Sequence, residues 1–276
     1  MFTFAHGTSS IVTRSASALA LVLILAACGG NGPDAAWKTA GPKAAEDPAA
    51  DAGYLRPPVL SGARARADGA VVLSGRAASG ALVRLGVPGG EPLTVEADEQ
   101  GNWSLALTRS DTARVFSLSM VVAETRQVQS AGYIAVLPDA RTVLLRPGAA
   151  ALVLGVSSDA PRLLSIDFDE GGAATIAGAA RPGSGLALRI DRSARAAGKA
   201  DDQGLFHLVV ENPITAGTHL FEVSGDSGEQ LLTLPIARAE TLGAAYRAVR
   251  IGPHWRIDWM TPAGGLQSTL ILGQES

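Results

Sequence analysis

Two groups of acidic residues have the chemistry that could bind Ca²⁺. The first group is Asp167, Asp169 and Glu170, and the second is Asp201 with Asp202. Carboxylate oxygens are ligands that Ca²⁺ prefers, but the spacing D-x-D-E-G-G does not complete an EF-hand loop. Asp98-Glu99 occupies the same place in a repeated segment described below. We therefore expect solvated turns at these positions and no metal site.

The segment Gly225-Asp226-Ser227-Gly228 spells the motif around the nucleophile of trypsin-like proteases. A serine nucleophile needs a histidine base, an acid that orients the histidine, and donors for the oxyanion. No matching histidine or aspartate motif precedes this serine. Because Asp, Ser and Gly also favour tight turns, we interpret the segment as a turn between strands.

The histidines give no sign of a metal or catalytic site. His207, His219 and His254 are not spaced two or four residues from another histidine or cysteine, as metal ligands on one element would be. No paired carboxylates or Ser–His constellation stands out elsewhere. The sequence therefore predicts no catalytic residues, no cofactor and no enzyme activity.

The C-terminal segment combines tryptophan, tyrosine and arginine. In a strand, Trp255, Ile257 and Trp259 would lie on one face, with Arg256 and Asp258 on the other. Aromatic rings beside arginine are typical of protein-contact hot spots and of glycan platforms. The candidate contact residues are Tyr246, Arg250, Trp255, Arg256 and Trp259. The alternative is that both tryptophans pack this segment onto a neighbouring domain.

The N-terminus has the layout of a secretory signal. One basic residue, Arg14, precedes the apolar run Ala18–Ala27. That run is shorter than the roughly 20 residues that a helix needs to span a bilayer. Residues 29–56 follow and are rich in Ala, Pro, Gly and charge, so we expect a flexible tether there.

The run ends in Leu25-Ala26-Ala27-Cys28, which resembles the lipobox of bacterial lipoproteins. The resemblance implies cleavage before Cys28, lipid attachment to its thiol and acylation, for example by palmitate, of the new N-terminus. Two or more acyl chains hold a protein firmly on a membrane. By their resemblance to enterobacterial sorting signals, Gly29 and Gly30, with no Asp after the cysteine, imply the outer membrane, facing the periplasm. The alternative is an ordinary secreted protein in which Cys28 is incidental or an inert buried thiol.

Composition limits the other function classes. The chain is 47% hydrophobic and 18% charged, which argues against disorder throughout. Its formal net charge is −3, its arginines are scattered, and nothing resembles a nucleic-acid-binding patch. Cys28 is the only cysteine, so an intramolecular disulfide is excluded.

A gapless internal repeat organises the rest of the chain. Residues 58–107 align with 161–210, and glycines, turn aspartates and apolar positions stay in step. Gly75 meets Gly178, and the segment 97–105 meets 200–208. Apolar and polar residues alternate within each copy, and Gly or Asp turns recur every 8 to 12 residues. The pattern predicts a duplicated β-sandwich or barrel.

Each copy resembles bacterial Ig-like domains. The second copy carries the family pattern in Gly178-Ala179-Ala180-Arg181-Pro182-Gly183, Ala200-Asp201-Asp202-Gln203-Gly204-Leu205-Phe206 and Ala216-Gly217-Thr218-His219-Leu220-Phe221. The first copy has Ser79 at the turn proline, keeps Trp103 and lacks the Gly-x-His strand start. The resemblance implies a fold, whereas such modules serve as spacers, stalks or binding platforms.

The sequence thus predicts an all-β protein with two tandem Ig-like β-sandwiches and a three-stranded C-terminal tail. The expected parts are a signal peptide (1–27), a lipid-anchored linker (28–56), Ig-like domains (57–138 and 160–238), a β-rich connecting segment (139–159) and a tail (239–276) with strands at 246–251, 255–260 and 267–272. The predicted function is a non-catalytic envelope lipoprotein, held to the membrane through Cys28, that acts as a structural or adaptor module with a protein partner at the tail. The alternative is a carbohydrate- or peptidoglycan-binding module.

Overall fold

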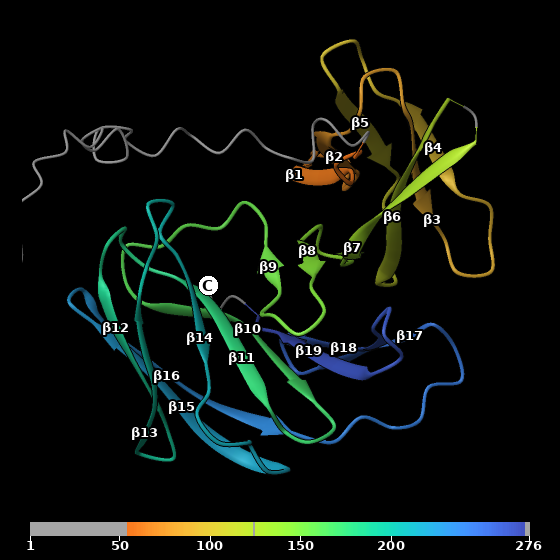
Figure 1. Ribbon diagram of the computed structural model, residues 1–276. Helices are drawn as coiled ribbons and strands as arrows, with labels where there is room; N and C mark the ends of the chain where they lie inside the picture. Colours follow the sequence, from red (N-terminus) through yellow and green to blue (C-terminus); the bar gives the residue numbers. More distant parts are fainter. Residues whose placement is uncertain (1–53, 124, 274–276) are drawn as a thin grey trace, which may run out of the picture. The chain divides into compact units, whose positions relative to one another are not determined.

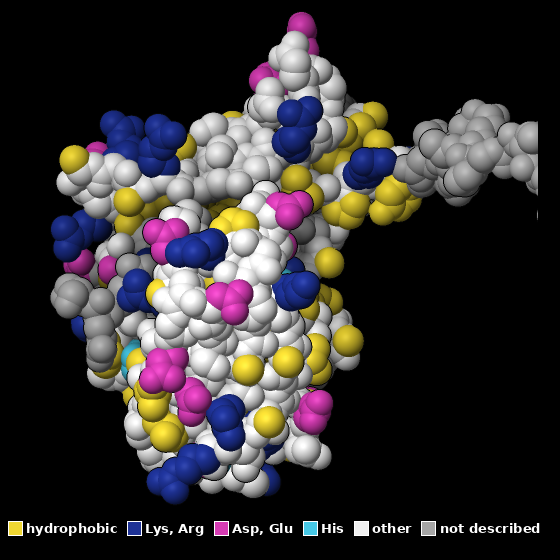
Figure 2. Space-filling model, turned by 90° about the vertical axis from the view of Figure 1, so that its left-hand side faces the viewer, with side chains coloured by type: hydrophobic (Ala, Val, Ile, Leu, Met, Phe, Trp, Pro, Cys, Tyr) yellow, Lys and Arg dark blue, Asp and Glu magenta, His cyan; other side chains and the backbone are white. Residues whose placement is uncertain are grey.

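The computed structural model describes residues 54–123 and 125–273, and every regular element within them is a β-strand (Figure 1). The all-β fold predicted from the alternating pattern is therefore confirmed. The described residues include no helix long and apolar enough to cross a membrane. Basic and acidic side chains are interspersed over the face that Figure 2 shows.

The first sandwich is built from seven strands. These are β1 (Val59–Ala65), β2 (Val71–Arg76), β3 (Leu82–Gly86), β4 (Leu93–Glu96), β5 (Asn102–Leu107), β6 (Arg114–Val122) and β7 (Arg126–Val136). One sheet has the order β1-β2-β5, and the facing sheet contains β4-β3-β6-β7. Alternate residues of both sheets point inward and form one buried cluster that includes Leu73, Leu85, Trp103 and Leu118.

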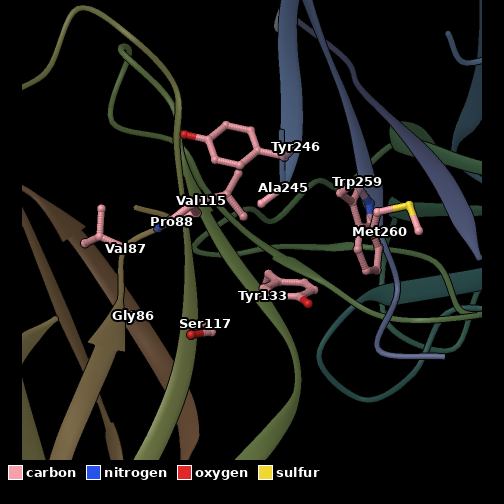
Figure 3. Close-up of a pocket in the computed structure, with 10 residues that line it drawn as sticks. All are labelled: Gly86, Val87, Pro88, Val115, Ser117, Tyr133, Ala245, Tyr246, Trp259 and Met260. Atoms are coloured by element: carbon pink, nitrogen blue, oxygen red, sulfur yellow. The ribbon is translucent and has the colours of Figure 1, made fainter. Parts of the chain in front are cut away.

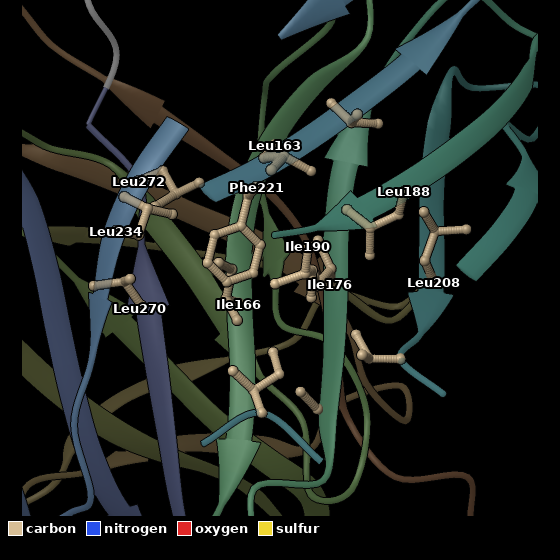
Figure 4. Close-up of a cluster of buried hydrophobic side chains, with 14 of the residues drawn as sticks. Leu163, Ile166, Ile176, Leu188, Ile190, Leu208, Phe221, Leu234, Leu270 and Leu272 are labelled. Carbon is tan, nitrogen blue, oxygen red and sulfur yellow. The ribbon is translucent and has the colours of Figure 1, made fainter. Parts of the chain in front are cut away.

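The second sandwich repeats this arrangement strand for strand. Its strands are β10 (Arg162–Asp169), β11 (Ala174–Ala179), β12 (Gly185–Ile190), β13 (Ser193–Lys199), β14 (Leu205–Val209), β15 (Gly217–Gly225) and β16 (Gly228–Ile236). β14-β11-β10 lie in one sheet and β13-β12-β15-β16 form the other. Both copies are thus immunoglobulin-like sandwiches with three strands facing four. Figure 4 shows the core of this copy, with Ile166, Leu188 and Phe221 at its centre.

The repeat follows from packing needs that both sandwiches share. Gly75 on β2 pairs directly with Trp103 on β5, and Gly178 on β11 pairs with Phe206 on β14. In each copy the aromatic ring lies over the glycine, in space that a Cβ atom would occupy. Glycine and an aromatic residue are therefore required together at these two positions.

The turn before each aromatic residue is also repeated. Asp98 Oδ1 accepts the backbone N–H groups of Gln100 and Asn102, at 3.0 and 2.7 Å. In the second copy, Asp201 Oδ1 does the same for the residues at 203 and 205. This aspartate-stabilised turn is the solvated turn that the sequence predicted, and it fixes the start of the strand that carries the aromatic ring.

The connecting segment and the tail each extend a sheet of one sandwich. β8 (Thr142–Leu145) and β9 (Leu152–Val153) continue the β7 side of the first sandwich. In the tail, β17 (Tyr246–Ile251), β18 (His254–Met260) and β19 (Leu266–Ile271) form the predicted three-stranded unit. β19 pairs with β10, so the sheet of the second sandwich runs β14-β11-β10-β19-β18-β17.

Candidate functional site at the C-terminal tail

The structure divides the five candidate contact residues into buried and accessible ones. Trp259 is 1% exposed and Arg256 is 7% exposed, whereas Arg250 is exposed and Tyr246 and Trp255 are half-buried. All five lie on the hairpin of β17 and β18. Because a partner cannot touch a fully buried ring, the accessible part of the candidate site is reduced to Tyr246, Arg250 and Trp255.

Trp259 lies in an apolar cluster that joins the two sandwiches, which we call the junction core. Its buried members are Ala113, Val115, Ala135, Leu137, Val143, Leu145, Ala151 and Val153 on the side of the first sandwich and connecting segment, and Leu164, Ala179, Ile257, Trp259 and Ile271 on the other side. The Trp259 ring meets Tyr133 edge to face, with centroids 5.5 Å apart. Trp259 Nε1 donates to Thr269 Oγ1 at 3.1 Å, so the indole N–H is satisfied in the interior.

The tail contributes to two cores at once because strand side chains alternate. On β19, Leu270 points into the core of the second sandwich, while its neighbour Ile271 points into the junction core. The tail therefore completes the second sandwich with one face and holds the first sandwich with the other. Tyr133 and Thr269 are essential to this arrangement and were missed by the sequence analysis, since no local pattern links positions so far apart.

On the opposite face of β18, Arg256 is held by groups of the protein itself. Arg256 Nε donates to Asp258 Oδ1 at 2.7 Å, and Ser268 Oγ donates to the same oxygen at 2.6 Å. The guanidinium lies 5.4 Å from the centroid of the Phe168 ring. The charge of Arg256 is thus neutralised internally, because an unpaired buried charge would be strongly destabilising.

Asp167 on β10 is a buried carboxyl that links three segments. Its Oδ2 accepts the N–H of Ala151 at 2.7 Å and the hydroxyl of Ser165 at 3.4 Å. Its Oδ1 accepts the hydroxyl of Thr269 at 2.6 Å and the amide of Gln267 at 3.3 Å. No cation pairs with Asp167 among the described residues. Burial therefore outweighs these hydrogen bonds and raises the pKa of Asp167 to about 6.

This shift predicts a specific pH dependence of stability. An unfolded carboxyl loses its proton near pH 3.8, whereas folded Asp167 keeps its proton up to about pH 6. The contribution of Asp167 is fully present below pH 3.8 and is lost as pH rises through 6, by about 3 kcal/mol in total. Urea unfolding of the wild type and Asp167→Asn from pH 7 to pH 4 measures it. We expect the wild type to gain stability relative to the variant as pH falls.

A difference between the two proteins that stays constant with pH would contradict the raised pKa of Asp167. Other titrating groups are common to both proteins and cancel in the comparison. His207 also contributes to the pH dependence of both proteins, because burial first, and then the charge of Arg146, lower its pKa in the folded state. The additional variant His207→Gln separates its contribution from that of Asp167.

A pocket of about 270 Å³ lies beside the junction core. Figure 3 shows its lining: Tyr133 and Val115 come from the first sandwich, Val87 and Pro88 from the loop after β3, and Tyr246, Trp259 and Met260 from the tail. The Tyr246 hydroxyl donates to the carbonyl of Ala113 at 3.3 Å, which fixes its ring at the pocket wall. The lining is mostly apolar, so the pocket suits an aliphatic or aromatic side chain.

The other residues that could do chemistry have structural partners. Gly225 pairs with Gly228 across the β15–β16 hairpin, so Asp226 and Ser227 form its tip. The Ser227 hydroxyl donates to the carbonyl of Asp159 at 2.6 Å, and no histidine of the described part of the chain hydrogen-bonds to it. A nucleophile needs a base within hydrogen-bond reach, so the geometry is that of a turn.

His219, which is largely buried, pairs with the exposed Asp191, and no nucleophile accompanies them among the described residues. His219 Nδ1 lies 2.7 Å from Asp191 Oδ2, and its other ring nitrogen meets the carbonyl of Thr215 at 3.0 Å. The hydrogen bond from His219 is the main cause that lowers the pKa of Asp191. Within 54–123 and 125–273, no three His, Cys, Asp or Glu residues gather as metal ligands would. Cys28 lies outside the described residues, so its lipidation stays a prediction.

Comparisons with known proteins give neither a family nor a function for this chain. No protein family and no curated protein matches the sequence. Similar solved structures include the BSP domain of a biofilm-associated protein (14% identity over 66% of this chain and 30% of that chain, TM-score 0.22), the central fibronectin-III array of RIM-binding protein (13%, 76%, 74%, 0.24) and invasin, a bacterial integrin-binding protein (11%, 79%, 54%, 0.23). The chain spans only about a third of the first of these and about half of the last. Because the TM-scores are low, the fold assignment rests on the strand order of this chain.

Proposed function

We propose that this protein is a membrane-anchored, non-catalytic adaptor of the bacterial envelope, in which the tail holds two Ig-like sandwiches as one rigid unit. The observation that carries the proposal is the junction core. Domains in one chain usually move against each other unless their interface is large and hydrophobic. Here thirteen buried side chains of the junction core come from both sandwiches, the connecting segment and the tail. Such a unit would hold a bound partner protein in a fixed position relative to both sandwiches.

Rigidity can be measured directly. Spin labels at cysteines introduced for Asp111 and Asp226, both exposed and one in each sandwich, report the distance between the sandwiches. We expect one narrow distance distribution for the full chain in detergent, with Cys28→Ser as the background. A broad or multimodal distribution would show that the sandwiches move independently and would refute the rigid adaptor.

The anchor rests on the sequence Leu25-Ala26-Ala27-Cys28. We expect cells to incorporate an alkyne analogue of palmitate into the wild type, because two or three acyl chains would be added at and beside this thiol. Cys28→Ser should abolish labelling and move the protein from the detergent phase to the aqueous phase in Triton X-114. The matched control Gly30→Ala should label normally. Labelling that survives Cys28→Ser would contradict the anchor.

Two of the aromatic side chains in the tail are poorly placed for the alternative function, glycan binding. A sugar platform needs accessible aromatic rings, and Trp259 is enclosed in the junction core. Tyr246 is fixed by its hydrogen bond to Ala113 and turned toward the pocket. Co-sedimentation of the full chain with purified sacculi tests the alternative, and binding there would favour a peptidoglycan-binding role over the adaptor.

A further inference from the structure

Among the residues that the structure describes, β17 has no neighbouring strand on one side and forms the edge of the tail sheet. It is the last strand of the order β14-β11-β10-β19-β18-β17 and pairs only with β18. The hairpin closes at Ile251 and His254, and hydrogen-bonded pairs then alternate along an antiparallel ladder. The N–H and C=O groups of Tyr246, Ala248 and Arg250 therefore point away from β18, toward the free edge. Such an edge is a template for an added strand.

The two ends of this edge differ in chemistry. Tyr246, at the start of β17, lines the apolar pocket of about 270 Å³ together with Tyr133 and Met260. Arg250, near its end, lines a second hollow of about 560 Å³. Tyr246 and Arg250 are four residues apart, so their side chains lie on the same face of the strand. The edge thus joins an apolar pocket to a basic hollow.

Arg250 is available to a ligand. Its Nε donates to the carbonyl of Gly252 at 3.1 Å, and it makes no ion pair among the described residues. Arg141 lines the same hollow but is already paired with Asp139 at 2.7 Å. Arg247, on the other face of β17, is paired with Glu240 at 2.6 Å. One unpaired cation on the pocket face of the edge strand therefore favours an acidic group on the partner.

We propose that β17 takes up an extended segment of an acidic partner protein as an added strand of the tail sheet. In an antiparallel pairing, a Glu or Asp of the partner lies opposite Arg250, and an apolar residue four positions later lies opposite Tyr246 and fills the pocket. The proposal rests on the adaptor function and names its docking surface. A second copy of this chain fits less well, because a centred antiparallel pairing of two β17 edges would place Tyr246, and no acidic residue, opposite Arg250.

The probe is a short fluorescein-labelled peptide with the core Glu-Val-Thr-Val-Leu, measured by fluorescence anisotropy against the full chain in detergent. We expect saturable binding that weakens by about tenfold or more when the Glu is replaced by Lys, because like charges would then face each other. A peptide with Glu and Leu only three positions apart should also bind weakly, since the two side chains would lie on opposite faces. Equal binding of all three peptides would overturn the proposal.

Two variants locate the bound peptide. Ala248→Pro removes an outward N–H but keeps the ladder to β18, as prolines on edge strands do, whereas Ala248→Ser keeps the N–H and serves as its control. Arg250 is exposed, so Arg250→Glu should leave the fold intact and make the protein bind the Lys peptide more tightly than the Glu peptide. Binding that is unchanged in both variants would overturn the proposal. If Ala248→Pro fails to fold, the charge reversal alone decides.

The outcome is separable from that of the adaptor function. Lipid labelling and the spin-label distance do not involve the free edge, so they can succeed while peptide binding fails. Mass photometry of the full chain reports self-association in the same samples. Dimers that vanish in Arg250→Glu or Ala248→Pro would show that the edge binds a second copy, and would overturn the acidic partner.

Discussion

Replacing Trp259 with alanine is expected to lower the free energy of unfolding by about 3–5 kcal/mol. The side chain is 1% exposed and lies between Tyr133 and the apolar members of the junction core. Its removal leaves a large cavity and takes away the indole N–H that donates to Thr269 Oγ1, while the Thr269 hydroxyl keeps its hydrogen bond to Asp167. Urea unfolding followed by circular dichroism measures the loss. The same variant should broaden the spin-label distance distribution, because the cavity loosens the contact between the sandwiches.

Trp255→Ala is the matched control. Trp255 lies on the same strand and the same face but is only half-buried at the margin of the junction core. Its removal should cost clearly less stability and leave the distance distribution narrow. If both variants lose the same stability, or if Trp259→Ala leaves the sandwiches rigidly coupled, the tail does not hold them together. Phenylalanine at position 259 should restore most of the loss, because it refills the cavity.

The elements of the fold could be predicted because their signals are local. Alternation of apolar and polar residues marks strands, and the aspartate turns at 98 and 201 mark their ends. The duplication strengthened the prediction of the fold, since the same turn spacing occurs in both copies. The tail strands were predicted at 246–251, 255–260 and 267–272, and they lie at 246–251, 254–260 and 266–271. Each of these features depends on neighbours within about ten residues.

The candidate site was only partly predictable because period-two patterns identify two faces but not what covers them. Arg256 and Asp258 alternate with Trp255 and Trp259, which suggested one buried face and one solvated face. In the structure the polar face is covered as well, and Arg256 is satisfied by Asp258 and Ser268. β19 pairs with β10, so one face of the tail packs on the core of the second sandwich and the other face packs in the junction core. That pairing joins residues about 100 positions apart, which no local pattern encodes.

The acidic residues show the same limit. Asp167 and Asp169 are two positions apart and were considered together as cation ligands. The strand that contains them turns Asp167 into the interior, where it accepts hydrogen bonds from the connecting segment and the tail. Asp169 instead accepts the backbone N–H of Ala173 in an exposed turn, at 3.0 Å. Their different environments come from long-range packing, so the raised pKa of Asp167 could not be predicted from the sequence.

Gly178→Ala is expected to destabilise the second sandwich by about 3 kcal/mol or more, although it adds a single methyl group. The new Cβ would overlap the ring of Phe206 and the backbone carbonyl of Arg162 on β10. The ring is enclosed in the sandwich core, and the carbonyl belongs to the strand that pairs with Gly178's own strand. Neither can move without breaking the sheet to which the tail is attached, so the variant should also loosen the tail.

The control for Gly178→Ala is Gly185→Ala on β12, where a Cβ would meet nothing within 4 Å and the backbone needs no left-handed conformation. Urea unfolding should show this control at or slightly above wild-type stability, since alanine loses less chain entropy than glycine on folding. Phe206→Leu in the Gly178→Ala background should recover only part of the loss, because the clash with the Arg162 carbonyl remains. If Gly178→Ala is as stable as the control, close packing of the aromatic ring does not require glycine at position 178. The same explanation for Gly75 with Trp103 would then fail.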